Sequence, residues 1–178
     1  QKVYFDSGAT LSYTFRKAQL KRLRKGIRKF EDKIMAALHA DLHKHPMEAY
    51  GSEIGFLYEE INYILNGLRH WMAPEAVTSP FVTYPSSSRV HKQPLGLTLI
   101  IGPWNYPFML LISPLLGAIA GGNCAVIKPS ELAPHTAAVT AALIKDTFDP
   151  AYITVAEGDG MEVIPVLMSF RFDHVFFT

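Results

Sequence analysis

The chain has 178 residues, of which 49% are hydrophobic and 19% are charged, and its formal net charge is +1. This length allows one domain, or one domain with part of a second, and so small a charge excludes a surface that as a whole attracts nucleic acid or acidic lipid. The single cysteine, Cys124, excludes an intramolecular disulfide framework and is typical of a reducing compartment, so we expect a cytoplasmic protein.

A long amphipathic helix is predicted over residues 13–43, because apolar residues recur there at steps of three and four. Its other face is strongly basic, and this face has two interpretations: a patch that binds nucleic acid or a membrane surface, or an ordinary solvated face. We favour the solvated face, since Glu31 and Asp32 balance part of the charge. The basic residues are Arg16, Lys17, Lys21, Arg22, Arg24, Lys25, Arg28, Lys29 and Lys33.

Pro46 is expected to end this helix, and a second amphipathic helix is predicted over residues 47–71. Two long helices joined by a short link form an antiparallel hairpin. The acidic residues Glu53, Glu59 and Glu60 are expected on the solvent-facing side of the second helix.

The composition changes between residues 73 and 94, where several prolines and a run of three serines exclude a helix. Residues 81–84 and 89–92 have the composition of two short strands. This segment is therefore predicted to be a β-ribbon that connects the helices to the rest of the chain.

From residue 95 onward, strand and helix patterns alternate, and this order predicts an α/β fold with a doubly wound parallel sheet and right-handed crossovers. The last predicted strand is followed by no turn or helix, so we expect the chain to be the first part of a longer protein. The predicted strands are residues 97–101, 124–128, 153–156 and 174–177, and the predicted helices are residues 108–120, 134–148 and 161–169.

A membrane span is the alternative interpretation of one part of this region, since no charged residue lies between Lys92 and Lys128. Prolines and glycines interrupt the stretch, however, and Asn105 lies within it. No unbroken apolar run reaches the roughly 18 residues that a span requires. We therefore predict no membrane contact from this chain.

The turn after the strand at 97–101 carries Trp104 and Asn105. In an open α/β sheet, ligands bind at the carboxyl ends of the strands. The uncharged amide of Asn105, held on a turn, is suited to donate to an oxyanion that forms only in a transition state. From these residues alone, an ordinary turn asparagine is the simpler interpretation.

Lys128, Ser130 and Glu131 directly follow the strand at 124–128. In a dinucleotide site, the group at this place contacts the adenosine ribose, because a carboxylate accepts from hydroxyls and an ammonium donates to them or to a phosphate. A surface turn that starts the next helix is the alternative. The segment 158–160, Gly-Asp-Gly, holds only the first two glycines of a G-x-G-x-x-G fingerprint and is weak evidence.

Neither the histidines nor the cysteine suggests another site. No pair of histidines has a spacing that we would assign to a metal, so no metal site is predicted. Cys124 lies inside a predicted buried strand and is expected to be an inert core residue.

Taken together, these segments resemble the aldehyde dehydrogenase superfamily, and within it the class 3 branch, which acts on fatty and aromatic aldehydes. The resemblance covers nearly the whole chain. Its most specific parts are the blocks Pro103–Pro107 and Lys128–Glu131 at this separation, and they favour a functional role for Asn105. The other matching segments are Phe5–Gly8, Ala40–Lys44, Pro94–Gly96, Gly117–Ala120, Gly122–Asn123 and Arg171–His174.

The resemblance implies a role for each matching residue. Asn105 would be the catalytic donor to the oxyanion of a thiohemiacetal, which forms when a cysteine attacks an aldehyde. Lys128 and Glu131 would hold the adenosine ribose of NAD, with NADP as a second cofactor, and Gly160 would lie near the pyrophosphate. Asn105 would also contact the cofactor. The other residues lining it would be Ile101, Pro103, Trp104 and Ser130, with Phe177 and Thr178 on the nicotinamide side.

The resemblance also implies the organisation of the whole enzyme, a homodimer that oxidises aldehydes to carboxylic acids. Residues 1–72 would be helices packing on the cofactor domain, residues 73–94 an oligomerisation ribbon, and residues 95–178 the first part of a Rossmann-like domain. The family's nucleophilic cysteine and general-base glutamate would follow residue 178, so the chain alone is expected to be inactive. The alternative is a non-catalytic nucleotide-binding or interaction fragment.

Overall fold

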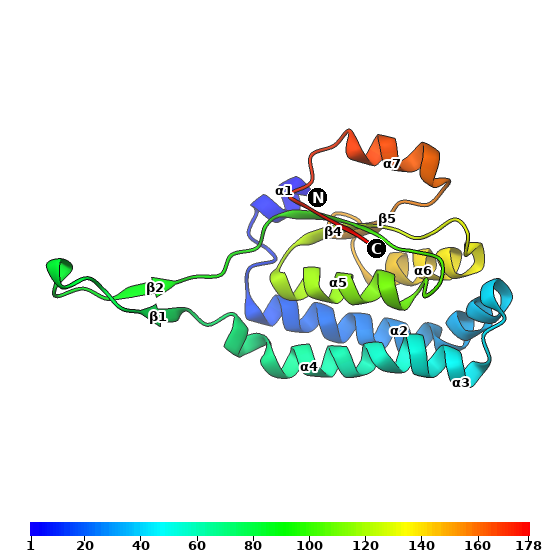
Figure 1. Ribbon diagram of the computed structural model, residues 1–178, viewed down its shortest axis with the longest axis horizontal. Coiled ribbons are helices and arrows are strands. Elements are labelled where there is room, and N and C mark those ends of the chain that lie inside the picture. The colour runs from blue at the N-terminus through cyan, green and yellow to red at the C-terminus, as the bar shows by residue number, and fades with distance from the viewer.

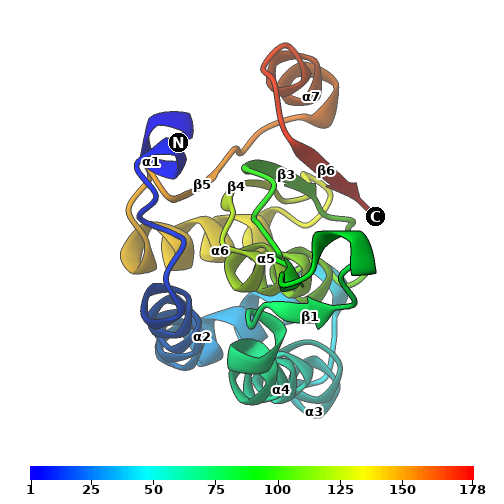
Figure 2. The same ribbon diagram turned by 90° about the vertical axis from the view of Figure 1, so that its left-hand side faces the viewer.

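A computed structural model describes residues 1–178, and at its centre four parallel strands form a sheet in the order β5-β4-β3-β6 (Figure 2). The strands are β3 (Leu97–Ile101), β4 (Cys124–Lys128), β5 (Ile153–Val155) and β6 (His174–Phe177). β4 is buried along its whole length and β3 along all but its first residue. This is the burial that near-continuous apolar strands of a parallel sheet require.

The helices between the strands cover both faces of this sheet (Figure 1). α5 (Met109–Gly121) and α6 (Pro134–Thr147) lie on one face, and α7 (Gly160–Met168) lies on the other. The chain runs outward from β3 through β4 to β5, and α7 then returns it to β6 on the opposite side of β3. The predicted doubly wound sheet is confirmed, and its winding reverses between β3 and β6.

The apolar stretch between Lys92 and Lys128 forms β3, a turn, the 13-residue helix α5 and β4. Among the helices of the structure, none has both the length and the apolar character needed to cross a bilayer.

Two long helices form a further layer beneath α5 and α6 (Figure 1). α2 (Tyr13–Leu42) packs closely on α6, and α4 (Gly55–Trp71) packs on α2 and α5. The approach of α2 to α6 depends on Gly26, since a Cβ atom there would lie 2.5 Å from Thr147 Oγ1. One apolar core runs through all these layers, from Leu20 and Leu57 on the long helices to Ile127 in the sheet.

The link between the long helices differs from the prediction that Pro46 ends the first of them. α2 already ends at Leu42, where His43 adopts the left-handed conformation (φ 54°) and donates its backbone N–H to the His39 carbonyl at 2.9 Å. Pro46 instead begins α3 (Pro46–Ala49), because a first-turn proline loses no helical hydrogen bond. A π-helical turn, η1 (Tyr50–Ile54), then joins α3 to α4.

The basic face of α2 is solvated along most of its length, with one exception. Arg16 is buried and donates to the carbonyls of Thr10 and Ala120, at 3.0 Å each. Lys29 pairs with Asp146 on α6 at 2.7 Å. Arg16 is thus a structural contact between α2 and α5 and does not belong to the solvated face.

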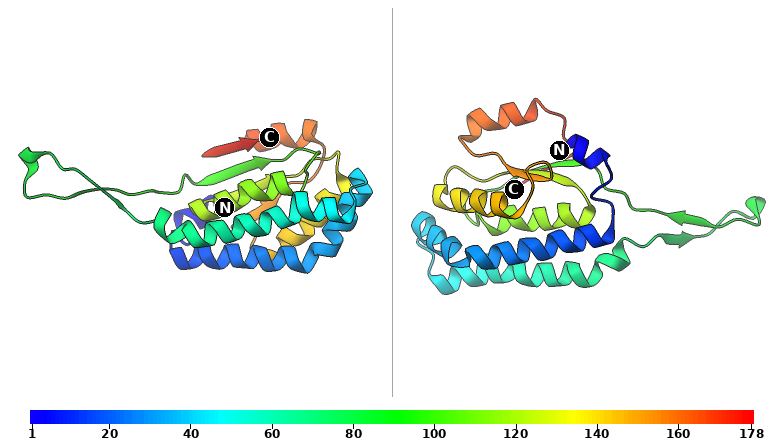
Figure 3. Two further views of the ribbon diagram at one scale, coloured as in Figure 1. Left: turned by 60° about the horizontal axis from the view of Figure 1, so that its bottom comes forward. Right: turned by 180° about the vertical axis from the view of Figure 1, so that it is seen from behind.

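The predicted ribbon exists, but one of its strands is displaced. β1 (Glu75–Val77) pairs antiparallel with β2 (Ser88–Val90), and the two project away from the rest of the molecule (Figure 3). Phe81–Thr83, predicted to be part of a strand, forms a 3₁₀ turn (η2) at the end of the ribbon. The first strand therefore lies some residues earlier than its β-branched composition indicates.

Candidate functional site

Three of the residues predicted to line the cofactor lie in one row at the carboxyl edge of the sheet. Ile101, the last residue of β3, is paired in register with Lys128 of β4 on one side and with Phe177 of β6 on the other. Thr178 follows, and its backbone N–H donates to the Ile101 carbonyl at 3.3 Å. The row crosses the point where the winding reverses, which is where open α/β sheets bind ligands.

The chain leaves β3 at this row through residues 102–108, which we call the Asn105 turn. Its first residue, Gly102, donates its backbone N–H to the Lys128 carbonyl at 3.0 Å. Trp104 and Asn105 are both exposed, so their side chains are accessible to a ligand at the sheet edge. The tight start of the turn explains the glycine, since a Cβ atom at Gly102 would lie 2.9 Å from a Leu111 methyl group.

Two buried charges lie against this turn, and the sequence analysis did not assign them to the site. Glu53, in the π-helical turn, is fully buried, and its Oε2 atom accepts from the backbone N–H groups of Phe108 (2.9 Å) and Met109 (3.2 Å). Its Oε1 atom pairs with the ammonium of Lys44, which is only 7% exposed. The same ammonium donates to the Asn105 carbonyl at 3.2 Å and lies 4.0 Å from the centre of the Tyr106 ring.

The expectation that Glu53, Glu59 and Glu60 all face solvent is therefore wrong for two of them. Only Glu59 is exposed. Glu60 is partly buried, its Oε1 atom accepts from the Ser113 hydroxyl at 2.9 Å, and its Oε2 atom has no partner. Burial raises the pKa of Glu60 above its ordinary value, and the Ser113 hydrogen bond opposes this rise.

The second predicted motif is held together by an ion pair at the end of β4. Lys128 is 1% exposed, and its ammonium contacts the carboxylate of Glu131, which is partly open to solvent. The hydrogen bond from Lys128 holds the pKa of Glu131 below its ordinary value, so this carboxylate is ionised at neutral pH. Ser130 accepts from the Leu132 backbone N–H at 3.2 Å.

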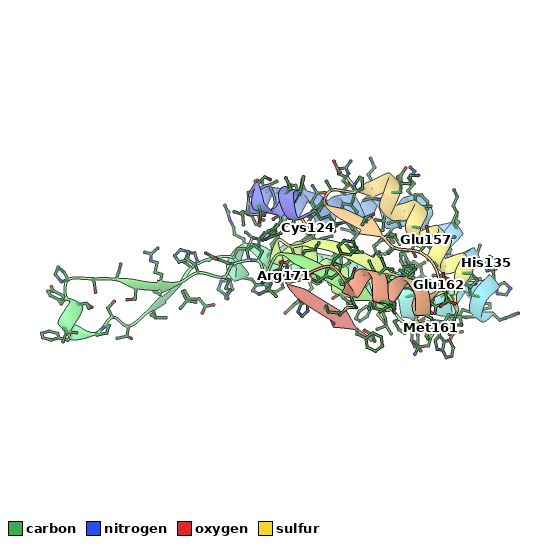
Figure 4. The ribbon with its side chains drawn as sticks, turned by 90° about the horizontal axis from the view of Figure 1, so that it is seen from above. Cys124, His135, Glu157, Met161, Glu162 and Arg171 are labelled. Atoms are coloured by element: carbon green, nitrogen blue, oxygen red, sulfur yellow. The ribbon has the colours of Figure 1, made fainter.

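The start of α7 lies against Glu131. A Cβ atom at Gly160 would lie 2.9 Å from Glu131 Oε1, so a larger residue at position 160 would displace this carboxylate. Asp159 caps the helix by accepting from the Met161 backbone N–H at 2.7 Å. Figure 4 shows Met161 and Glu162 at the same end of the molecule as Glu157 and His135.

A cleft of about 260 Å³ opens between the Glu131 segment and the loop before α7. Exposed backbone at Gly158 and a half-open carboxylate at Glu131 give it hydrogen-bonding groups that fit a ribose. A cavity of about 720 Å³ lies elsewhere, between α1 (Lys2–Asp6), the end of α4 and the ribbon, and none of the predicted site residues lines it. The cleft is lined by Pro129, Glu131, Pro134, Ala137, Glu157, Gly158 and Asp159.

Cys124 lies away from this edge. It begins β4, where it pairs in register with Leu97, so it sits at the amino end of the sheet (Figure 4). It is fully buried, and burial raises the pKa of its thiol to about 11. Cys124 is therefore the inert core residue that the sequence predicts.

Comparison with known proteins gives consistent matches over the whole chain. The aldehyde dehydrogenase family pattern matches residues 2–178. A 4,4'-diaponeurosporen-aldehyde dehydrogenase from Staphylococcus aureus is 46% identical over 177 residues, which are 99% of this chain and 38% of that protein. An "aldehyde dehydrogenase, dimeric NADP-preferring" from Canis lupus familiaris is 42% identical over 174 residues, which are 98% of this chain and 38% of that protein.

Comparison of the fold with solved structures also finds an aldehyde dehydrogenase. A solved structure of Staphylococcus aureus AldH in a substrate-bound state matches with a TM-score of 0.96 at 45% identity, over 99% of this chain and 38% of that one. The chain thus spans 38% of the length of each of these three relatives.

Proposed function

The chain belongs to the aldehyde dehydrogenase family, and from this premise we propose that it forms the cofactor-binding portion of an NAD(P)-dependent aldehyde dehydrogenase. The complete enzyme, in which the chain is joined to the remaining length of its relatives, would oxidise an aldehyde to a carboxylic acid. One observation carries the proposal: Asn105 is exposed on the turn that leaves β3, where the sheet reverses its winding, and Lys128 is buried at the end of the neighbouring strand.

In the proposed reaction, a cysteine thiolate from the rest of the enzyme attacks the aldehyde carbon and forms a thiohemiacetal. The carbonyl π electrons move onto the oxygen, and the side-chain NH₂ of Asn105 donates a hydrogen bond to this oxyanion. Because the charge is larger in the transition state than in the bound aldehyde, the bond lowers the barrier. A dinucleotide, when bound, supplies the two-electron acceptor for the oxidation.

For the cofactor, we propose that Glu131 accepts from the adenosine ribose hydroxyls while Lys128 orients the Glu131 carboxylate and donates to the ribose. The ion pair between them supports this role, since it places an ionised carboxylate at the mouth of the cleft. Gly160, in the first turn of α7, would let a pyrophosphate approach the helix N-terminus.

The walls of the proposed cofactor site come from the row at the carboxyl edge of the sheet, from the Asn105 turn and from the segment after β4. NAD is the proposed preferred cofactor, because a carboxylate near the ribose 2′-hydroxyl disfavours a 2′-phosphate. NADP is the proposed second cofactor, as the name of the Canis lupus familiaris relative suggests. The walls would be Ile101, Pro103, Trp104, Ser130, Phe177 and Thr178.

We also propose a cytoplasmic homodimer in which residues 73–94 take part in assembly and residues 1–72 pack on the cofactor domain formed from residue 95 onward. The exposure of Phe81 and Val82 supports a role of residues 73–94 in assembly, because both apolar side chains are about 90% exposed at the end of the ribbon. The name of the Canis lupus familiaris relative includes the word dimeric. Sedimentation of the complete enzyme with Phe81→Ser and Val82→Ser should show monomers.

The decisive experiment for the reaction is Asn105→Ala in the complete enzyme. Losing one oxyanion donor should lower kcat by about 10²–10³-fold and weaken cofactor binding far less. Equal losses in kcat and in cofactor binding would refute the role of Asn105. Cofactor binding by calorimetry without any aldehyde turnover would instead favour a non-catalytic nucleotide-binding protein.

A further inference from the structure

We propose that Lys44 and Glu53 are positioning residues, which fix the main chain of the Asn105 turn so that the Asn105 amide meets the oxyanion. This inference rests on the proposed function of Asn105 and adds two residues to it. Both lie on the link between the long helices and are buried against the turn, and they bond to turn residues that lie 61 and 55 positions further along the chain.

Glu53 fixes the end of the turn. The sequence at the start of α5 supplies no capping side chain, and the residue at the N-cap, Phe108, cannot accept a hydrogen bond from the free N–H groups. Glu53 Oε2 takes that place from another helix, at 2.9 Å from the Phe108 nitrogen and 3.2 Å from the Met109 nitrogen. A carboxylate is also favoured by the positive end of the helix dipole.

Lys44 fixes the middle of the turn. Its ammonium donates to the Asn105 carbonyl at 3.2 Å, lies over the Tyr106 ring at 4.0 Å and pairs with Glu53. The two charges together therefore contact residues 105, 106, 108 and 109. No other buried ion pair of two full charges touches the turn.

Glu53 lies in a π-helical turn next to the end of the Asn105 turn. A π-turn adds a residue to the helix and shifts the direction of its side chains, and such turns are often found at functional sites. η1 spans Tyr50–Ile54 and lies beside the start of α5.

A buried ion pair is weak evidence for net stability, because the desolvation of both charges offsets their attraction. Here the ion pair matters because it holds the main chain of the Asn105 turn in one position. The Asn105 side chain is exposed, so the place of its amide depends on where the main chain holds the residue. A displacement of about 1 Å in a positioned group can cost on the order of 10²-fold in rate.

The test compares three changes in the complete enzyme with a matched control. Lys44→Met keeps the aliphatic stem and removes the ammonium, Glu53→Gln removes the charge at constant shape, and the double variant leaves no buried charge unpaired. The control is Glu60→Gln, which alters a carboxylate on α4, the helix that follows η1. Glu60 contacts α5 through Ser113, away from the turn.

We expect Lys44→Met and the double variant to lower kcat by about 10–100-fold with an unchanged cofactor Kd, and Glu60→Gln to keep the kcat of the unmodified enzyme. In an Asn105→Ala background, the same changes should cause no further loss of kcat. Losses that add to that of Asn105→Ala, or an equal loss from Glu60→Gln, would overturn the proposal. Lys44→Arg, which keeps the charge, should recover part of the activity.

A second readout does not depend on activity. Hydrogen–deuterium exchange of a peptide covering residues 105–110 should be faster in Lys44→Met and in Glu53→Gln, and unchanged in Glu60→Gln. Unchanged exchange in both Lys44 and Glu53 variants would overturn the positioning role. If exchange accelerates but Asn105→Ala keeps full kcat, the proposed function of Asn105 fails while the mechanical link to the turn stands. If Glu53→Gln does not fold, Lys44→Met and Lys44→Arg decide the question.

Discussion

Asp41 caps the helix α6 from a distance in the sequence: its Oδ2 atom accepts from the backbone N–H of Thr136, 95 residues later, at 2.7 Å. Its Oδ1 atom accepts from the His135 ring nitrogen Nδ1 at 2.7 Å and from the His135 backbone N–H at 3.2 Å. Ala133, at the N-cap of α6, has no side chain that could do this. The end of α2 thereby fixes the start of α6, a few residues after the Lys128–Glu131 pair.

Asp41→Ala should lower the free energy of unfolding by about 1–2 kcal/mol at pH 7, the usual cost of losing a helix cap. Urea denaturation measures it. The control is Asp6→Ala, which removes an ion pair with Lys2 that solvent screens, and which should therefore lower the free energy of unfolding much less than Asp41→Ala does. Equal losses from the two variants would show that Asp41 is not a cap.

The stabilisation that the Asp41 cap provides should also depend on pH. Burial alone would raise the pKa of Asp41, but hydrogen bonds from Thr136 and His135 outweigh burial and hold the pKa below its ordinary value. The stabilisation is therefore complete above the pKa of an unfolded aspartate, about 3.9, and is lost as the pH falls through the lower folded pKa. The free energy of unfolding should exceed that of Asp41→Ala by a constant amount from pH 6 to 8. This excess should become smaller below about pH 4.

The effect of Gly26→Ala on stability should depend on the side chain at position 147. Gly26→Ala should destabilise the protein, because the new Cβ atom would lie 2.5 Å from Thr147 Oγ1. In a Thr147→Ala background that oxygen is gone, and the nearest remaining atom would be Thr147 Cβ at 3.6 Å. There the same change should stabilise α2 by about 0.8–1 kcal/mol, the helix propensity of alanine over glycine. Thermal unfolding of the four proteins checks this, and destabilisation in both backgrounds would contradict it.

The central strands of the sheet, β3 and β4, could be predicted from the sequence because each is a short apolar run bounded by glycine, proline or asparagine. β3, β4 and β6 have the predicted bounds, and β5 ends one residue earlier than expected. β1 could not be predicted in this way. Phe81–Thr83 has the stronger strand composition but forms a turn, because pairing with Ser88–Val90 selects Glu75–Val77 instead.

The role of Glu53 was missed for a related reason. Positions 53, 57, 61, 64 and 68 follow steps of four and three, so the spacing itself places Glu53 on the buried stripe of the helix. Because Glu53 is charged, its side chain was expected to be exposed to solvent. The groups that pair with this charge, Lys44 and the start of α5, could not be identified from the local sequence pattern. Helical periodicity was the better guide to burial.

Cys124 should not react with thiol reagents while the protein is folded. With a thiol pKa of about 11, roughly one thiol in a thousand is ionised at pH 8, and no reagent reaches a fully buried sulfur. Peptide mass spectrometry of the complete enzyme after alkylation should find Cys124 unmodified without denaturant and modified with it. Cys124→Ala should keep kcat, since the thiol lies at the amino end of the sheet; a loss comparable to that of Asn105→Ala would contradict this placement.

Glu131→Gln should shift the choice between NAD and NADP. The Glu131 carboxylate, kept ionised by Lys128, would repel a 2′-phosphate, and the neutral amide would not. The ratio of kcat/KM with NADP to kcat/KM with NAD should rise roughly tenfold, as expected for removing one unit charge a few ångströms away near the surface. Glu157→Gln is the matched control, because Glu157 lines the same cleft and is exposed. An unchanged ratio in Glu131→Gln, or an equal rise in Glu157→Gln, would mean that Glu131 does not contact the ribose.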